Sequence, residues 1–115
     1  MPLKGRRFEY INSNPFFTSI SYISNNNNCL FSVLKNASTV KHNYKTYRDY
    51  FGLPYNEMIT TNIINKKLSK YFKLNIRVFN GSTGTIIAKA YTDPKFKKVD
   101  IMLQDFHYSR IVKKK

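Results

Sequence analysis

The apolar pattern of this chain changes its period near residue 73, and this change constrains the fold more than any other feature. Three earlier stretches have apolar residues at helical spacing: a helix beginning at Cys29, residues 42–51 and residues 55–72. Four later stretches alternate apolar and polar residues: 74–79, 85–91, 99–103 and 107–112. The sequence therefore predicts an α+β fold, with N-terminal helices packed on a C-terminal antiparallel meander.

Turn-forming residues separate these stretches. Residues 1–24 are broken by Pro2, Gly5 and Pro15, and we expect an irregular or partly extended N-terminal arm there. The polar run of residues 25–28 favours a turn, and its last residue, Asn28, is expected to cap the following helix. At 115 residues the chain is expected to form a single domain over residues 1–115.

The net charge is the strongest compositional signal. Twenty Lys and Arg against six Asp and Glu give +14, which points to an anionic partner such as nucleic acid or a membrane surface. However, 15 Lys and 13 Asn are also what an A/T-rich genome supplies in excess. A basic nucleic-acid-binding sheet is therefore one hypothesis, although the strands lack the interleaved aromatic signature of known RNA-binding sheets. Its basic residues would be Arg77, Lys89, Lys97 and Lys98.

The counts of Cys and His exclude several other classes. One Cys cannot form an intramolecular disulfide, and one Cys with two His makes no zinc site, so we expect no metal and no cofactor. No stretch approaches the roughly 20 apolar residues of a membrane span. These observations favour a monomer in the cytoplasm with a reduced thiol.

Cys29 and His107 are the residues whose positions suggest chemistry. Cys29 follows a polar turn at the start of a helix, where free N–H groups and the helix dipole favour a thiolate. His107 begins the last predicted strand. A Cys early on a helix with a His late on a strand is the layout of papain-like cysteine hydrolases. The alternative is that Cys29 is a small core residue.

The residues around both positions resemble the ovarian-tumour (OTU) family of cysteine proteases. Asn28-Cys29-Leu30-Phe31 and the following apolar pair match that family's nucleophile motif, usually Asp-Gly-Asn-Cys-Leu-Phe. His107-Tyr108 resembles the dipeptide that supplies the family's base. The resemblance covers about residues 20–112, and the short length is similar to compact viral members.

The resemblance implies a deubiquitinase that cleaves peptide or isopeptide bonds after the C-terminus of ubiquitin or a ubiquitin-like protein. A viral member would act in the host cytoplasm and would also process a viral polyprotein. Cys29 would be the nucleophile and His107 the general base. Backbone N–H groups of Cys29 and of the Asn26–Asn27 turn would bind the oxyanion, and Phe106 and Tyr108 would flank a channel for the substrate tail.

The sequence also departs from the family pattern. Asn26 and Asn27 replace the usual Asp and Gly, so Asn27 is expected to adopt backbone angles that Gly normally allows. Ser109 stands where many members have an Asp or Asn that orients the His. The site would then be a Cys–His dyad oriented at most by Ser109, or another residue would substitute, with Asn12, Asn14 and Asp105 as candidates.

A catalytically weak or dead OTU fold used as an interaction module therefore remains an alternative. The charge adds a constraint, because ubiquitin presents a largely basic recognition face that a basic enzyme does not attract. Contacts to its tail would come from the few carboxylates: Glu57, Asp93, Asp100 and Asp105.

Overall fold

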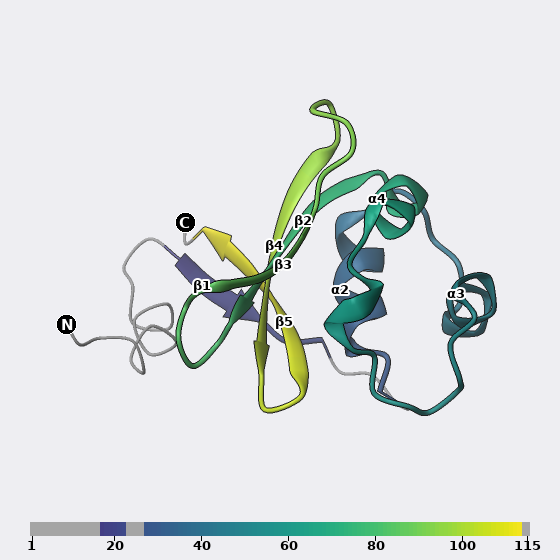
Figure 1. Ribbon diagram of the computed structural model, residues 1–115, viewed down its shortest axis with the longest axis horizontal. Helices are drawn as coiled ribbons and strands as arrows, with labels where there is room; N and C mark the ends of the chain where they lie inside the picture. The colour runs from purple at the N-terminus through teal and green to yellow at the C-terminus, as the bar shows by residue number, and fades with distance from the viewer. Residues whose placement is uncertain (1–16, 23–26, 114–115) are drawn as a thin grey trace.

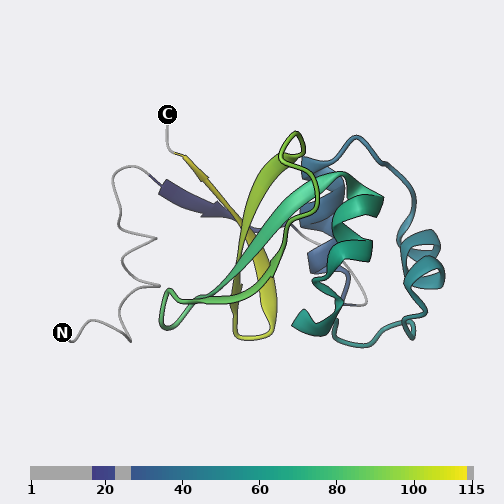
Figure 2. The ribbon, with the colours of Figure 1, turned by 45° about the horizontal axis from the view of Figure 1, so that its top comes forward.

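The computed structural model describes residues 17–22 and 27–113 and has an α+β architecture, as predicted. A five-stranded mixed sheet forms one layer, and helices α2 and α4 pack on one of its faces, with α3 further out (Figure 1). The turned view in Figure 2 shows the same two layers. Most of the expected N-terminal arm lies outside the described residues.

The sheet is mixed, and the prediction of an antiparallel meander was wrong. The strands are β1 (Phe17–Ile20), β2 (Leu74–Asn80), β3 (Ile86–Ala90), β4 (Lys97–Gln104) and β5 (His107–Lys113). Their order is β1-β5-β4-β2-β3, so β4 does not pair with β3, which precedes it in the chain. Instead β4 pairs in parallel with β2, on the opposite side of β2 from β3. The other neighbouring strands are antiparallel.

Asn75 explains how the chain crosses from β3 to β4. Its side chain is buried at the start of β2, where it donates to the carbonyl oxygens of Asp93 and Phe96 and accepts from the backbone N–H of Thr92. These bonds hold the β3–β4 link across the end of β2. The chain therefore re-enters the sheet beside Leu74 and runs parallel to β2.

The first two predicted helices are present. The first, α2 (Cys29–Ala37), begins at the predicted residue and is almost entirely buried. The second, α3 (Tyr44–Phe51), begins two residues later than predicted because Asn43 caps it, accepting from the backbone N–H of Thr46. Gly52 ends α3 in the left-handed conformation, with φ 67°.

The single helix predicted over residues 55–72 is wrong in its first half. The structure has a turn, the short 3₁₀ helix η2 (Thr61–Ile63) and then α4 (Lys66–Phe72). Asn65 interrupts the apolar periodicity because its side chain accepts from the backbone N–H of Leu68 and so starts a new helix. The apolar residues before it are still buried, but from a loop and η2.

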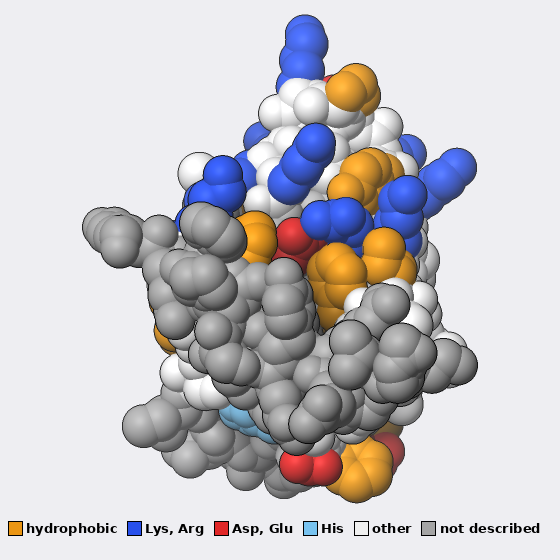
Figure 3. Space-filling model, turned by 90° about the vertical axis from the view of Figure 1, so that its left-hand side faces the viewer, with side chains coloured by type: hydrophobic (Ala, Val, Ile, Leu, Met, Phe, Trp, Pro, Cys, Tyr) orange, Lys and Arg blue, Asp and Glu red, His pale blue; other side chains and the backbone are white. Residues whose placement is uncertain are grey.

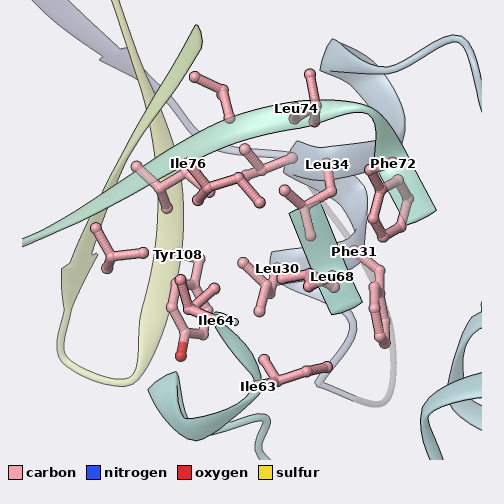
Figure 4. Packing of buried hydrophobic residues seen from close by; sticks show 14 of the residues in the cluster. Leu30, Phe31, Leu34, Ile63, Ile64, Leu68, Phe72, Leu74, Ile76 and Tyr108 are labelled. Atoms are coloured by element: carbon pink, nitrogen blue, oxygen red, sulfur yellow. The ribbon is translucent and has the colours of Figure 1, made fainter. Parts of the chain in front are cut away.

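The core lies between the sheet and helices α2 and α4, and Figure 4 shows how its side chains meet there. Alternate residues of β2 point into it, namely Leu74, Ile76 and Val78. From the helices the fully buried residues include Leu30, Phe31, Leu34, Leu68 and Phe72. This packing fixes the N-terminus of α2 against the sheet, which positions Cys29.

Candidate active site

Cys29 is the first residue of α2, and its sulfur lies at the edge of β5. The backbone N–H of Tyr108 donates to Cys29 Sγ at 3.4 Å. Strand β1 pairs with β5 only from Arg110 onward, so Tyr108 lies beyond the end of β1. The sulfur of Cys29 therefore occupies the edge position that a longer β1 would cover.

His107 immediately precedes that N–H group. Because two covalent bonds join Tyr108 N to His107 Cα, this Cα lies within about 6 Å of Cys29 Sγ. The sulfur's hydrogen bond is to the backbone of Tyr108, and within the described residues none joins Sγ to the imidazole. The His107 side chain is half-buried, and strand alternation directs it to the face opposite that of the Tyr108 side chain. The fold thus brings the backbone of His107 close to the Cys29 sulfur, although the two residues are far apart in the sequence.

The N-terminus of α2 provides hydrogen-bond donors beside the sulfur. The first N–H groups of a helix have no partner within that helix, and they carry a partial positive charge. The first turn-closing bond of α2 runs from the N–H of Ser32 to the carbonyl of Asn28. The backbone amides of Cys29 and the next two residues precede this bond, so they are oriented to stabilise an anion.

Asn28 occupies the N-cap position, but the expected side-chain cap is absent. Its side-chain oxygen instead accepts from Arg48 Nε at 2.7 Å, and no bond joins the Asn28 side chain to the first turn of α2. The prediction of the helix start was therefore right, whereas the predicted role of the Asn28 side chain was wrong. The Asn28 side chain bonds to Arg48 instead of capping the helix because a hydrogen bond to a buried charged group is stronger than one to a neutral backbone N–H.

Arg48 organises this loop, although it was not among the residues predicted from the sequence. Its buried guanidinium also donates to the carbonyl of Asn27 at 3.0 Å and to the carbonyl oxygens of Glu57 and Pro54. It thereby joins the loop before the nucleophile to residues 54–57. Burial lowers the pKa of Arg48, and the Glu57 carboxylate partly opposes this change. The available sequence signal was that Arg48 lies four residues after Tyr44, on the inward face of α3.

Asn27 has φ 61°, in the left-handed region expected for a residue at the position of the family's Gly. Its side-chain amide donates to the carbonyl of Asn56 at 2.7 Å, which ties the nucleophile loop to the same 54–57 segment. Asn26, the other predicted oxyanion-loop residue, lies outside the described residues. Asn27, the described residue of the predicted loop, is therefore held by two hydrogen bonds, one from its side-chain amide to Asn56 and one from Arg48 to its carbonyl.

Tyr108 does not line a channel, and this prediction was wrong. Its side chain lies among the core residues (Figure 4) and is fully buried, and its hydroxyl donates to the carbonyl of Ile59 at 2.7 Å. Burial raises the pKa of the Tyr108 phenol, and the proximity of Cys29 raises it further. The cause is strand alternation: Tyr108 points toward the helices, so its neighbours in the strand do not. Phe106, by contrast, is 82% exposed in the β4–β5 turn beside His107.

Neither of the described candidates for a His-orienting residue is hydrogen-bonded to the imidazole of His107. Ser109 is buried, and its hydroxyl forms a hydrogen bond with that of Ser21 at 3.0 Å. Asp105 lies in the β4–β5 turn with φ 51°, and its carboxylate accepts from the Gln104 amide at 3.4 Å. Asn12 and Asn14 lie outside the described residues. Among residues 17–22 and 27–113, no carboxylate is hydrogen-bonded to the His107 imidazole, so an orienting acid is not found there.

Comparison of the chain with protein-family models, curated proteins and solved structures gives no match. In the described ranges, no group of three or more His, Cys, Asp or Glu side chains is arranged to hold a metal ion. None of the helices described is long and apolar enough to cross a membrane.

Proposed function

We propose that this chain is an OTU-like cysteine protease that cleaves peptide or isopeptide bonds after the C-terminus of ubiquitin or a ubiquitin-like protein. The observation that carries the proposal is the contact between Cys29 Sγ and the backbone N–H that follows His107. It joins a helix N-terminus to the strand with the family's His-Tyr dipeptide. A core Cys needs neither a helix N-terminus nor a neighbouring His, so both features favour chemistry over packing alone.

In the first half-reaction, His107 takes the proton of the Cys29 thiol, and the sulfur attacks the scissile carbonyl carbon. The carbonyl oxygen becomes an oxyanion, which the N–H groups at the start of α2 stabilise. The carbon–nitrogen bond then breaks, and His107 returns the proton to the leaving amine. The products of this half are a free amine and a Cys29 thioester.

In the second half-reaction, water replaces the amine. His107 removes a proton from the water, whose oxygen attacks the thioester carbonyl and forms a second oxyanion. The carbon–sulfur bond then breaks, His107 gives its proton to the leaving sulfur and so restores the Cys29 thiol, and the ubiquitin-like protein leaves with a free carboxylate. His107 acts without an orienting carboxylate in this scheme, so slow turnover is expected.

Access to the sulfur favours a narrow, extended substrate. Cys29 is only 6% exposed, and exposed Phe106 stands next to His107. A slender C-terminal tail can reach a sulfur in this setting more easily than a folded loop can. The same chemistry would process a viral polyprotein at a matching cleavage sequence.

A ubiquitin bearing a C-terminal electrophile tests the proposal directly. The wild type should form a covalent adduct, Cys29→Ala should form none, and His107→Ala should react at least about 100-fold more slowly. Circular dichroism of each variant checks that the fold is retained. An unreactive wild type, or equal labelling of Cys29→Ala, would sink the proposal. The same probe built on other ubiquitin-like proteins identifies the modifier.

An interaction module on the same fold is the second candidate. It is favoured by the observation that the hydrogen bond of Cys29 Sγ goes to the Tyr108 backbone rather than to the imidazole. Titration of isotope-labelled ubiquitin with the protein distinguishes the two. Saturable chemical-shift changes without any probe adduct would identify the module, whereas adduct formation would exclude it.

A further inference from the structure

The face of the sheet opposite the helices carries a row of charged side chains. Arg77 of β2 lies opposite Lys89 of β3 on one side and opposite Asp100 of β4 on the other. Arg77 makes a two-pronged ion pair with Asp100, with both N–O distances 2.8 Å. Lys98, two residues before Asp100, is exposed on this same face.

Apolar and aromatic side chains lie between these charges. Ile87 of β3 is 42% exposed, and Tyr91, the first residue after β3, is 38% exposed. Lys89 Nζ lies 4.9 Å from the centre of the Tyr91 ring, and the Arg77 guanidinium lies 5.2 Å from that of Phe79. Figure 3 shows Lys and Arg side chains beside hydrophobic ones over the upper part of this face.

The electrostatic balance of this face is positive. Three of the four basic residues of strands β2, β3 and β4 lie on it, namely Arg77, Lys89 and Lys98, together with the one acidic residue of these strands, Asp100. Because Asp100 is already paired with Arg77, it neutralises one cation and leaves the lysines of β3 and β4 without a carboxylate on these strands. A basic recognition face of another protein is therefore not the partner that this surface fits.

We propose that this outer sheet face, defined by Arg77, Phe79, Ile87, Lys89, Tyr91 and Lys98, binds single-stranded nucleic acid. Lys89 and Lys98 contact phosphates, and unpaired bases stack on Tyr91 and Phe79. An extended strand with alternating phosphates and flat bases matches a face on which cations lie beside two aromatic rings. A duplex hides its bases, so it would leave these two rings unused.

This surface is separate from the proposed active site. Its six residues belong to β2, β3, β4 and the link after β3, whereas Cys29 meets the sheet at β5. Cys29→Ala should therefore bind nucleic acid as well as the wild type does. Failure of either proposal leaves the other intact, because one is read by adduct formation and the other by nucleic-acid affinity.

Charge reversal at matched positions tests the location. Fluorescence anisotropy with labelled twelve-nucleotide uridine and thymidine strands, at two salt concentrations, measures affinity and its salt dependence. Lys89→Glu with Lys98→Glu should weaken binding at least about tenfold and lower the salt slope. Lys66→Glu with Lys70→Glu, on exposed positions of α4, changes the net charge equally and should weaken binding much less. Equal losses in the two double variants would overturn the proposal.

Removal of an aromatic ring tests the stacking. Tyr91→Leu keeps an apolar side chain but removes the ring, and it should weaken binding about tenfold. Tyr55→Leu removes a ring that is 49% exposed in the loop after α3 and should leave affinity unchanged. Tighter binding of uridine than of thymidine strands would assign the face to RNA, and the reverse to DNA. Binding of anionic lipid vesicles but of neither strand would contradict the proposal and identify a membrane surface instead.

Discussion

The sulfur of Cys29 and the backbone nitrogen of Tyr108 lie 3.4 Å apart, although 79 positions separate the two residues in the sequence. The contact exists because α2 packs its apolar face on the sheet and because β1 stops before it reaches Tyr108. It uses the main chain of Tyr108, so the side chain of that residue is free for another role. That role is to fill the core.

Tyr108→Phe separates these two roles. The substitution removes the hydroxyl that donates to Ile59 and leaves a buried carbonyl without that partner, so it should destabilise the fold by about 1–2 kcal/mol. The backbone N–H that meets Cys29 is unchanged, so the KM for a ubiquitin substrate should stay the same. Urea denaturation and steady-state kinetics measure the two effects. Tyr91→Phe is the control and should not change stability. A raised KM for Tyr108→Phe would instead show that the Tyr108 side chain contacts the substrate, as the channel prediction requires.

Arg48→Ala should be among the most destabilising single substitutions in this chain. It leaves buried acceptors from Asn27, Asn28 and the 54–57 segment without their donor, at a cost of about 3 kcal/mol or more. Arg48→Lys restores the charge but not the fork of donors, so it should recover only part of the loss. Chemical denaturation measures both. The control is Arg110→Ala, whose partner Asn36 is exposed and which should cost less than about 1 kcal/mol.

Asn27 provides a test of backbone conformation. With φ 61°, Asn27→Gly loses only the side-chain bond to Asn56, whereas Asn27→Ala also acquires left-handed strain. The alanine variant should therefore be less stable than the glycine variant by about 1 kcal/mol in thermal or urea unfolding. An alanine variant as stable as the glycine variant would contradict the left-handed conformation.

Asn75→Ala should loosen the crossover that makes the sheet mixed. The N–H of Thr92 and the carbonyl of Asp93 lose their partner, at a cost of about 2 kcal/mol. Limited proteolysis should then cut within residues 91–96 faster than in the wild type. Asn62→Ala, at an exposed position on η2, is the matched control and should change neither stability nor the cleavage pattern.

Asp49 gives the fold an acid-sensitive contribution. Its hydrogen bond from Tyr55, and then that from Lys45, lower the pKa of this carboxyl below its usual range. A carboxyl with a lowered folded-state pKa stabilises the fold above its unfolded pKa of about 4, and the contribution disappears as pH falls through the folded value. Asp49→Asn should therefore be less stable than the wild type at neutral pH, and the difference should vanish in acid. Tyr55→Phe should shift this loss toward higher pH, and a pH-independent difference would contradict the linkage.

Local patterns in the sequence predicted much of the fold correctly. The alternation of residues 74–79 is that of β2, α2 starts at the predicted Cys29, and α3 ends at residue 51, as the predicted stretch 42–51 does. These features depend on interactions within a few residues. The prediction of one helix over 55–72 was wrong because a loop that packs on a core can have the same apolar spacing as a helix. The helix starts only after Asn65, whose side chain caps it.

The sequence by itself determined the α+β class, the helix that begins at Cys29 and the choice of Cys29 and His107 as the residues to examine. Only the tertiary structure decided that β4 runs parallel to β2, that Tyr108 is buried and that Arg48 holds the loop before Cys29. Strand pairing and buried polar bonds join residues that are tens of positions apart, and the local spacing of apolar residues does not identify such partners. The net charge of +14 was known from the start, but only the register of β2, β3 and β4 placed part of it on one face with exposed rings.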